Sequence, residues 1–331
     1  MMEAKEAYQF QLISSCSKAP RTLFRHLSSM VSANSIPSTV HLNGTYESDR
    51  AKKSEMFNTF NSTFTDSVQC PLSTCTPTMV CNQIEITEAD VCEALSTLDA
   101  NKSPGPDNIS PSVLKYCAVA LTPPLHKLFI QSLQSGQLPS EWKLHLIVPI
   151  FKSGNKSDIK NYRPISLLCT ISKVLERIIY KKIIDYIYPL ISVNQYGFLK
   201  GKSCVLKLLS SLAIIVDSLD RRHSVDAIYL DVRKAFDSVS HQVLISKLQL
   251  YGITGDLLAW FKGYLDNRRH CVRLEGHISG ELQVKSGVPQ GSILGPILFL
   301  LYVNDLFPCV LHSLFTMFAD DSECLKELIS P

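Results

Sequence analysis

The residues best suited to chemistry are two adjacent acids, Asp320 and Asp321, which follow the apolar stretch Leu314–Phe318. This order is typical of a buried strand that delivers a pair of carboxylates into a turn. Like charges buried side by side destabilise a fold by several kcal/mol unless a cation neutralises them. The pair therefore indicates a metal site.

A third acid, Asp231, lies near the end of a second apolar stretch, Ala227–Val232, which we expect to be a buried strand. About ninety residues separate Asp231 from Asp320, enough for the two strands to lie side by side. Carboxylates that converge from neighbouring strand ends can hold two Mg²⁺ ions about 3.5–4 Å apart for phosphoryl or nucleotidyl transfer. Taken alone, however, either motif is more often an ordinary turn at a strand end.

Composition sets broad limits on the class of protein. The chain has 331 residues, of which 45% are hydrophobic and 19% charged, and this is a globular composition with room for two domains or subdomains. The net charge is only +3, but the segment Trp142–Lys202 holds 11 Lys and Arg against 3 Asp and Glu. Such a segment suits phosphate binding, although an ordinary solvated face would have the same charge count.

Cysteine usage and hydropathy bear on the compartment. The eleven cysteines show no paired spacing, and the N-terminus lacks the apolar segment of a signal peptide. The longest apolar run, near Ile293–Val303, is too short to span a bilayer. We therefore expect an intracellular protein, in the nucleus or the cytoplasm or both, without a membrane anchor.

Local patterns predict alternating helices and strands after a polar lead-in. We expect residues 1–83 to be loosely packed, with one helical pattern at Ala51–Phe60. Further helices are expected after Thr87 (with Asp90 as a capping box), from Pro111, and over Ile171–Ile187, Cys204–Leu219, His241–Leu250, Asp256–Leu265 and Ile293–Leu306. Strands are expected over Leu146–Phe151 (opening a hairpin through Ser166), Ala227–Val232, His270–Leu274, Glu281–Lys285 and, last, Phe315–Ala319.

Six ordered blocks of residues follow one another along the chain. They are Asn101-Lys102-Ser103-Pro104-Gly105-Pro106-Asp107, Asn161-Tyr162-Arg163-Pro164-Ile165-Ser166-Leu167-Leu168, Gln195-Tyr196-Gly197-Phe198, Leu230-Asp231-Val232-Arg233-Lys234-Ala235-Phe236-Asp237, Gly287-Val288-Pro289-Gln290-Gly291-Ser292-Ile293-Leu294-Gly295-Pro296 and Phe318-Ala319-Asp320-Asp321. In this order they resemble the motifs of reverse transcriptases from non-LTR (LINE-type, jockey-like) retrotransposons, in which the last three blocks are motifs A, B and C.

The resemblance implies an α+β fold of the right-hand polymerase type. Helical fingers would surround a hairpin, and a palm would carry the acids on an RRM-like antiparallel sheet. Residues 84–331 would form the fingers and palm, and residues 1–83 resemble the linker that follows the endonuclease in full-length elements. The implied activity is RNA-directed DNA polymerisation with two Mg²⁺ ions, an RNA template, a DNA primer and deoxynucleoside triphosphates.

The resemblance also assigns the acids. Asp231 and Asp320 would be the principal catalytic metal ligands, with the carbonyl of Val232 as a further oxygen and Asp321 in support. We expect Asp237 to be structural, because it begins the loop before the next helix.

The same resemblance assigns a nucleotide site. Lys152 and Arg163 would grip the triphosphate, and Phe236 would lie beneath the sugar and exclude a 2′-hydroxyl. Gln290 would hydrogen-bond near the nascent base pair, and Gly291 would admit close backbone approach. Without the motifs, the two cations would be interpreted as surface residues, Phe236 as part of the core, and Gln290 with Gly291 as a turn.

Three departures from the family pattern leave an alternative open. Leu199 replaces the usual Arg, and Glu323 adds a negative charge near the expected metals. The chain ends at Pro331, so we expect the strand that returns after motif C, the primer grip and the thumb to be missing. The alternative is a catalytically silent, truncated remnant that at most binds nucleic acid. A nucleotidyl cyclase is disfavoured, because it would not need motif B.

Overall fold

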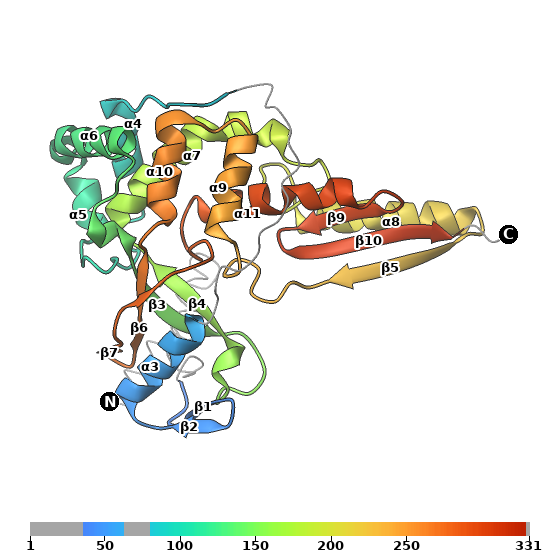
Figure 1. Cartoon of the computed structure of the whole chain (residues 1–331), viewed down its shortest axis with the longest axis horizontal. Helices are drawn as coiled ribbons and strands as arrows, with labels where there is room; N and C mark the ends of the chain where they lie inside the picture. Colours follow the sequence, from blue (N-terminus) through green and yellow to red (C-terminus); the bar gives the residue numbers. More distant parts are fainter. Residues whose placement is uncertain (1–35, 63–79, 329–331) are drawn as a thin grey trace, which may run out of the picture.

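The computed structural model describes residues 36–62 and 80–328, which combine helices with three sheets (Figure 1). The helices are α3 (Arg50–Asn61), α4 (Glu88–Ser96), α5 (Pro111–Tyr116), α6 (Ala118–Ser135), α7 (Thr170–Ile187), α8 (Cys204–Asp220), α9 (His241–Leu250), α10 (Gly255–Leu265) and α11 (Gly295–Val303). The strands are β1 (Val40–Leu42), β2 (Thr45–Glu47), β3 (Leu144–Phe151), β4 (Tyr162–Leu167), β5 (Ser224–Leu230), β6 (Arg269–Leu274), β7 (His277–Ile278), β8 (Leu282–Gln283), β9 (Leu314–Phe318) and β10 (Asp321–Leu328).

A helical layer contains the largest apolar core. Buried side chains of α4, α6, α7, α9, α10 and α11 pack together in it, with Trp260 and Phe261 of α10 fully buried. The predicted capping box of Thr87 and Asp90 is confirmed at the start of α4, and Pro111 is the first residue of α5. The mixture of helices and sheets agrees with the expected α+β class.

The five-stranded sheet lies below this layer in Figure 1. Its strands run in the order β4-β3-β6-β7, and β8 pairs with β6. The predicted hairpin is confirmed, because β3 and β4 are antiparallel from Leu146↔Leu167 to Phe151↔Tyr162. The strands expected over His270–Leu274 and Glu281–Lys285 are present as β6 and β8, and they pair with each other, with Arg269 opposite Gln283.

The N-terminal elements pack against this sheet. Val40 of β1 and Phe57 of α3 are buried in a second apolar cluster with Ile147 of β3 and Val272 of β6. The expected helix in the lead-in is therefore present, but the expected loose packing does not hold for residues 40–61. The rest of that lead-in, residues 1–35 and 63–79, lies outside the described residues.

The three-stranded sheet has β10 at its centre. Its order is β5-β10-β9, and β10 is antiparallel to both neighbours. Our expectation that β9 would be the last strand, with no strand returning after the two acids, is wrong. Residues Asp321–Leu328 form that returning strand, which begins at the second acid itself.

Strand β5 is more exposed than its sequence predicts. Ile228, Tyr229 and Leu230 are 57%, 70% and 51% exposed, so the expectation of a buried strand is wrong for β5. The reason is its place at one edge of the sheet in the described structure, where only β10 pairs with it.

Helix α8 contacts β5 and β9 of this sheet (Figure 1) and supplies a cation to it. The Glu323 carboxylate lies 3.5 Å from the Lys207 ammonium of α8 and accepts a 2.6 Å hydrogen bond from Ser211. Burial alone would raise the pKa of Glu323, but these contacts and the Tyr229 hydroxyl lower it. The charge of Glu323 is thus compensated beneath α8. Our expectation that Glu323 would add an uncompensated negative charge near the metals is wrong.

Across the described residues, no helix is both long and apolar enough to cross a membrane. The cysteines described there are free thiols, which agrees with their unpaired spacing in the sequence.

Replacement of Glu323 tests the buried ion pair. Glu323→Gln removes the anion that pairs with Lys207, so at pH 7 we expect a loss of about 3 kcal/mol in unfolding free energy. Because the pKa of Glu323 is lowered in the fold, its contribution is present above about pH 4.3 and disappears as pH falls through the lowered value.

Chemical denaturation at several pH values measures this effect. Glu327→Gln is the matched control, because this carboxylate on the same strand pairs with His223 at a more exposed place, where loss of one ion pair changes stability little. Equal losses in both variants would contradict the assignment.

Candidate active site

A cavity of about 620 Å³ gathers most of the residues predicted for chemistry. Of the predicted residues, those that line it are Lys152, Arg163, Asp231, Val232, Phe236, Gln290, Gly291 and Asp320. They come from the β3–β4 hairpin, the loop after β5, the loop before α11 and the turn after β9. Asp321 is the one predicted residue that does not line the cavity.

The register of the three-stranded sheet brings the acids together. Leu230 lies opposite Ser322, so the antiparallel register, extended by one position, places Asp231 opposite Asp321. Burial raises the pKa of the Asp320 carboxyl, and the charges of Asp321 and Asp231 add to that rise. The three carboxylates therefore repel one another at one point, and a cation there would relieve the repulsion.

The turn that carries Asp320 is held by Gln195. Ala319 is buried with a left-handed φ of 58°, and its N–H donates to Oε1 of Gln195 at 2.9 Å. The same oxygen accepts from Gly197 N–H at 2.8 Å, and a Cβ at Gly197 would lie 2.3 Å from the nitrogen of Ala319. We recognised this block as a motif but did not predict its role, because the sequence does not show that it pairs with β9.

The donor set fits a hard divalent cation. Carboxylate oxygens of Asp231 and Asp320 and a backbone carbonyl at Val232 are the ligand types that Mg²⁺ accepts. Within residues 36–62 and 80–328, no three His, Cys, Asp or Glu side chains form a compact metal-binding group. The fit therefore rests on two carboxylates in the cavity, and a role of Asp321 as a third ligand stays a prediction.

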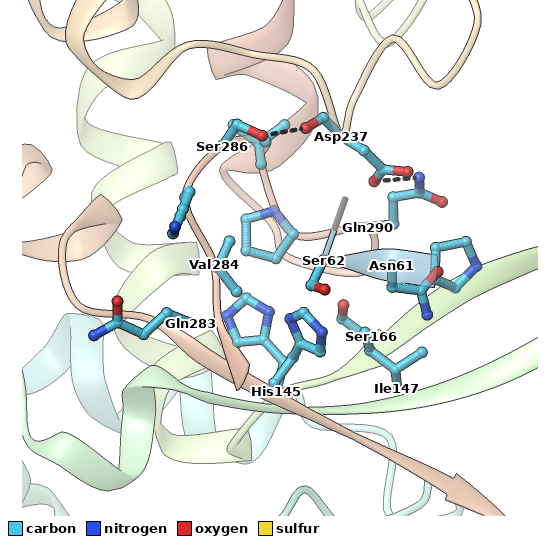
Figure 2. A pocket seen from close by; sticks show the side chains of 16 residues that line it. Asn61, Ser62, His145, Ile147, Ser166, Asp237, Gln283, Val284, Ser286 and Gln290 are labelled. Atoms are coloured by element: carbon cyan, nitrogen blue, oxygen red, sulfur yellow. Dashed lines mark hydrogen bonds between the residues drawn. The ribbon is translucent and has the colours of Figure 1, made fainter. Parts of the chain in front are cut away.

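Motif B is fixed between motif A and the hairpin. Gln290 Nε2 donates to Oδ1 of Asp237 at 3.0 Å, and Ser166 N–H donates to the Gln290 carbonyl at 2.8 Å. Figure 2 shows the pair Asp237 and Gln290 beside a smaller pocket of about 60 Å³, with Ser286 bonded to the Asp237 carbonyl. Gly291 has φ 126°, and a Cβ there would lie 2.6 Å from the Ser166 carbonyl, so the close approach requires glycine.

The aromatic ring of Phe236 is fixed from two sides. It stacks on Phe299 of α11 with centroids 4.3 Å apart and meets Phe198 edge-on at 5.9 Å. Phe236 is half-buried and lines the cavity, so it both packs in the core and forms part of the cavity wall.

Basic side chains outnumber acids on the cavity wall. Lys152 and Arg163 are joined there by Lys160, Arg233 and Lys234, which our predictions did not include, against the three acids Asp231, Asp237 and Asp320. Burial lowers the pKa of Lys234 to about 8, and Asp237 opposes the shift.

Phe60 of α3 also lines the cavity and was missed, because its segment has a polar sequence typical of a linker.

A family model described as reverse transcriptase (RNA-dependent DNA polymerase) matches residues 152–326, which is more than half of the chain. The chain belongs to the reverse transcriptase family. The match includes every residue that we predicted for the site, from Lys152 to Asp321. Phe60 lies outside it.

Curated relatives of this reverse transcriptase come from non-LTR retrotransposons. It is 33% identical over 253 residues to a probable RNA-directed DNA polymerase from transposon BS of Drosophila melanogaster, covering 74% of this chain and 26% of that protein. It is 35% identical over 239 residues to the one from transposon X-element of the same species, covering 70% and 26%. It is 27% identical over 224 residues to the one from mobile element jockey, also of Drosophila melanogaster, covering 67% and 24%.

The chain thus spans about a quarter of the length of these relatives. The resemblance expected from the six motifs is confirmed: this is a reverse transcriptase domain of the LINE type.

Replacement of Asp320 tests the repulsion among the acids. Because the pKa of Asp320 is raised in the fold, the ionised carboxylate opposes folding at pH 7. Asp320→Asn should therefore raise the melting temperature of the metal-free protein, by about 1–2 °C. The gain should shrink as pH falls through the raised pKa of Asp320 and vanish below its ordinary value of about 3.9, where the wild-type carboxyl is protonated in both states.

Thermal unfolding with EDTA and with Mg²⁺ measures this gain. Added Mg²⁺ should stabilise the wild type and not Asp320→Asn, which closes or reverses the gap between them. A variant that is less stable than the wild type in EDTA at pH 7 would contradict the repulsion.

Proposed function

We propose that this chain is the catalytic region of an RNA-directed DNA polymerase of a non-LTR retrotransposon. It would extend a DNA primer on an RNA template with deoxynucleoside triphosphates. The observation that carries the proposal is the single cavity in which Asp231 and Asp320 meet basic side chains, the Phe236 ring and motif B. In this reading the three-stranded sheet is the palm and the β3–β4 hairpin belongs to the fingers.

Asp231, Asp320 and the carbonyl of Val232 would hold two Mg²⁺ ions, with Asp321 in support. When bound, the ions would activate the primer 3′-hydroxyl and stabilise the leaving pyrophosphate. The contribution of the chain is to fix the two carboxylates on one sheet, so that their position does not depend on the substrate.

The other residues would orient the nucleotide. Lys152 and Arg163 on the hairpin would bind the triphosphate, Arg163 as a planar fork and Lys152 as a point charge. Phe236 would lie beneath the sugar, held there by its stack on Phe299. The fixed Gln290 amide and the bare backbone of Gly291 would face the nascent base pair.

The template and primer would be held mainly through their phosphates. A polymerase must accept every sequence, so its contacts favour the backbone over the bases. The basic segment Trp142–Lys202 includes β3, β4 and α7 and would supply part of this surface.

Primer extension by the 331-residue chain tests the proposal. We expect Mg²⁺-dependent extension of an oligo(dT) primer on poly(rA). Asp231→Asn and Asp320→Asn should each reduce the rate on the order of 100-fold or more, since each removes charge aimed at the transition state. RNA binding that weakens with salt, without extension and unchanged in Asp320→Asn, would support the silent remnant instead.

Replacement of Phe236 tests the proposed sugar contact. Phe236→Val opens space beneath the sugar, so incorporation of ribonucleotides should rise about 10- to 100-fold relative to deoxynucleotides. The ratio of the two kcat/KM values is the measurement, and it is insensitive to the amount of folded enzyme. An unchanged ratio would place Phe236 in the core alone.

A further inference from the structure

Helix α3 contributes to the cavity although it lies outside the stretch that matches the family. We propose that Phe60 of α3 is a positioning residue, which holds the Lys234 ammonium where it binds the phosphates of the incoming nucleoside triphosphate. The inference rests on the proposed function and adds to it a second structural element and a further phosphate-binding cation.

Helix α3 is anchored independently of any substrate. Lys53 is 1% exposed and donates to the Pro37 carbonyl and to Glu275, both at 3.1 Å. Asn58 Nδ2 donates to the Gly280 carbonyl at 2.8 Å, and Gly280 N–H donates to Glu55 at 2.6 Å. These contacts tie α3 to the β6–β7 hairpin and to the segment after it, so the helix is a fixed wall.

The ammonium of Lys234 lies 3.6 Å from the centroid of the Phe60 ring. This is well inside the range in which the electrons of an aromatic face attract a cation, and the ring is only 8% exposed. The contact joins motif A to α3 across 174 residues of sequence, counted from 60 to 234.

The Lys234 backbone is fixed from the other side. Its φ of 52° is left-handed, and its carbonyl accepts from the N–H groups of Asp237 and Ser238 at 2.9 and 3.1 Å. The side chain therefore starts from a defined turn and ends over a defined ring. Both ends lie on the wall of the cavity that also holds Lys152 and Arg163.

Charge indicates what the ammonium binds. The cavity is lined by five basic and three acidic side chains, and two of the acids are the proposed metal ligands. Once Mg²⁺ neutralises those acids, the remaining lining is strongly positive and suits a triphosphate. Lys234 follows Asp231 by three residues, so a nucleotide that reaches the acids also reaches the turn that carries Lys234.

The plain alternative is that α3 only covers the sheet. Phe57, one turn earlier, has that role: it is 1% exposed, meets the Tyr162 ring edge-on at 5.2 Å and does not line the cavity. Both rings belong to the apolar cluster, and Phe60 in addition contacts the lysine, so Phe57 and Phe60 form a matched pair.

The test is equilibrium binding of a fluorescent deoxynucleoside triphosphate with Mg²⁺ to the full chain, together with thermal unfolding. Phe60→Leu should raise Kd about five- to tenfold, the effect expected for a partly desolvated cation–ring contact. Phe60→Tyr keeps an aromatic ring and should retain most of the wild-type affinity. Phe57→Leu should lower the melting temperature while leaving Kd unchanged.

A double-mutant cycle adds a readout that a structural role would not move. Lys234→Gln should weaken binding, and adding Phe60→Leu to it should have little further effect. An unchanged Kd in Phe60→Leu, or an equal rise in Phe57→Leu, overturns this inference while the proposed function stands. A wild-type chain that binds no nucleoside triphosphate overturns both.

Discussion

The pairing of β10 with strands on both of its sides is the constraint on which the site depends. One edge of β10 pairs with β9 and the other with β5, so the ends of two strands about ninety residues apart in sequence must meet. That meeting places Asp231 beside Asp320 and Asp321. Burial raises the pKa of Asp320, the repulsion among the three acids adds to the rise, and the packing of the sheet offsets the cost. Stability is thus given up at the point where a cation would bind.

The elements around the sheet keep that arrangement fixed. Gln195 and Gly197 support the left-handed residue Ala319 from one side, and Lys207 neutralises Glu323 beneath α8 from another. Motif B is bonded to motif A through Gln290 and Asp237, and to the hairpin through Ser166. The cavity walls are therefore connected by hydrogen bonds between elements that the chain order separates widely.

The residues of the site could be predicted from the sequence more fully than the elements that hold them in place. The acids, the hairpin and motif B were predictable because turn residues and carboxylates have strong local patterns. Strand β10 was missed because its sequence is rich in charged residues and is typical of an exposed tail. These residues are Asp321, Glu323, Lys326 and Glu327. Only the fold shows that Lys207 and Ser211 compensate the buried charge of Glu323. Local patterns likewise cannot show that β5 lies at an edge, or that Phe60 in a polar segment reaches a lysine of motif A.

The central claim is that Asp231 and Asp320 bind the same metal ions. Iron-mediated cleavage tests it directly: Fe²⁺ is added in place of Mg²⁺ with hydrogen peroxide and ascorbate, and the hydroxyl radicals formed when peroxide oxidises the iron cut the backbone close to the bound metal. We predict cuts near residues 231 and 320 together, suppressed by excess Mg²⁺ and lost from both places in Asp231→Asn and in Asp320→Asn. Cuts at only one of the two places, or cuts near residue 231 that persist in Asp320→Asn, would contradict the claim.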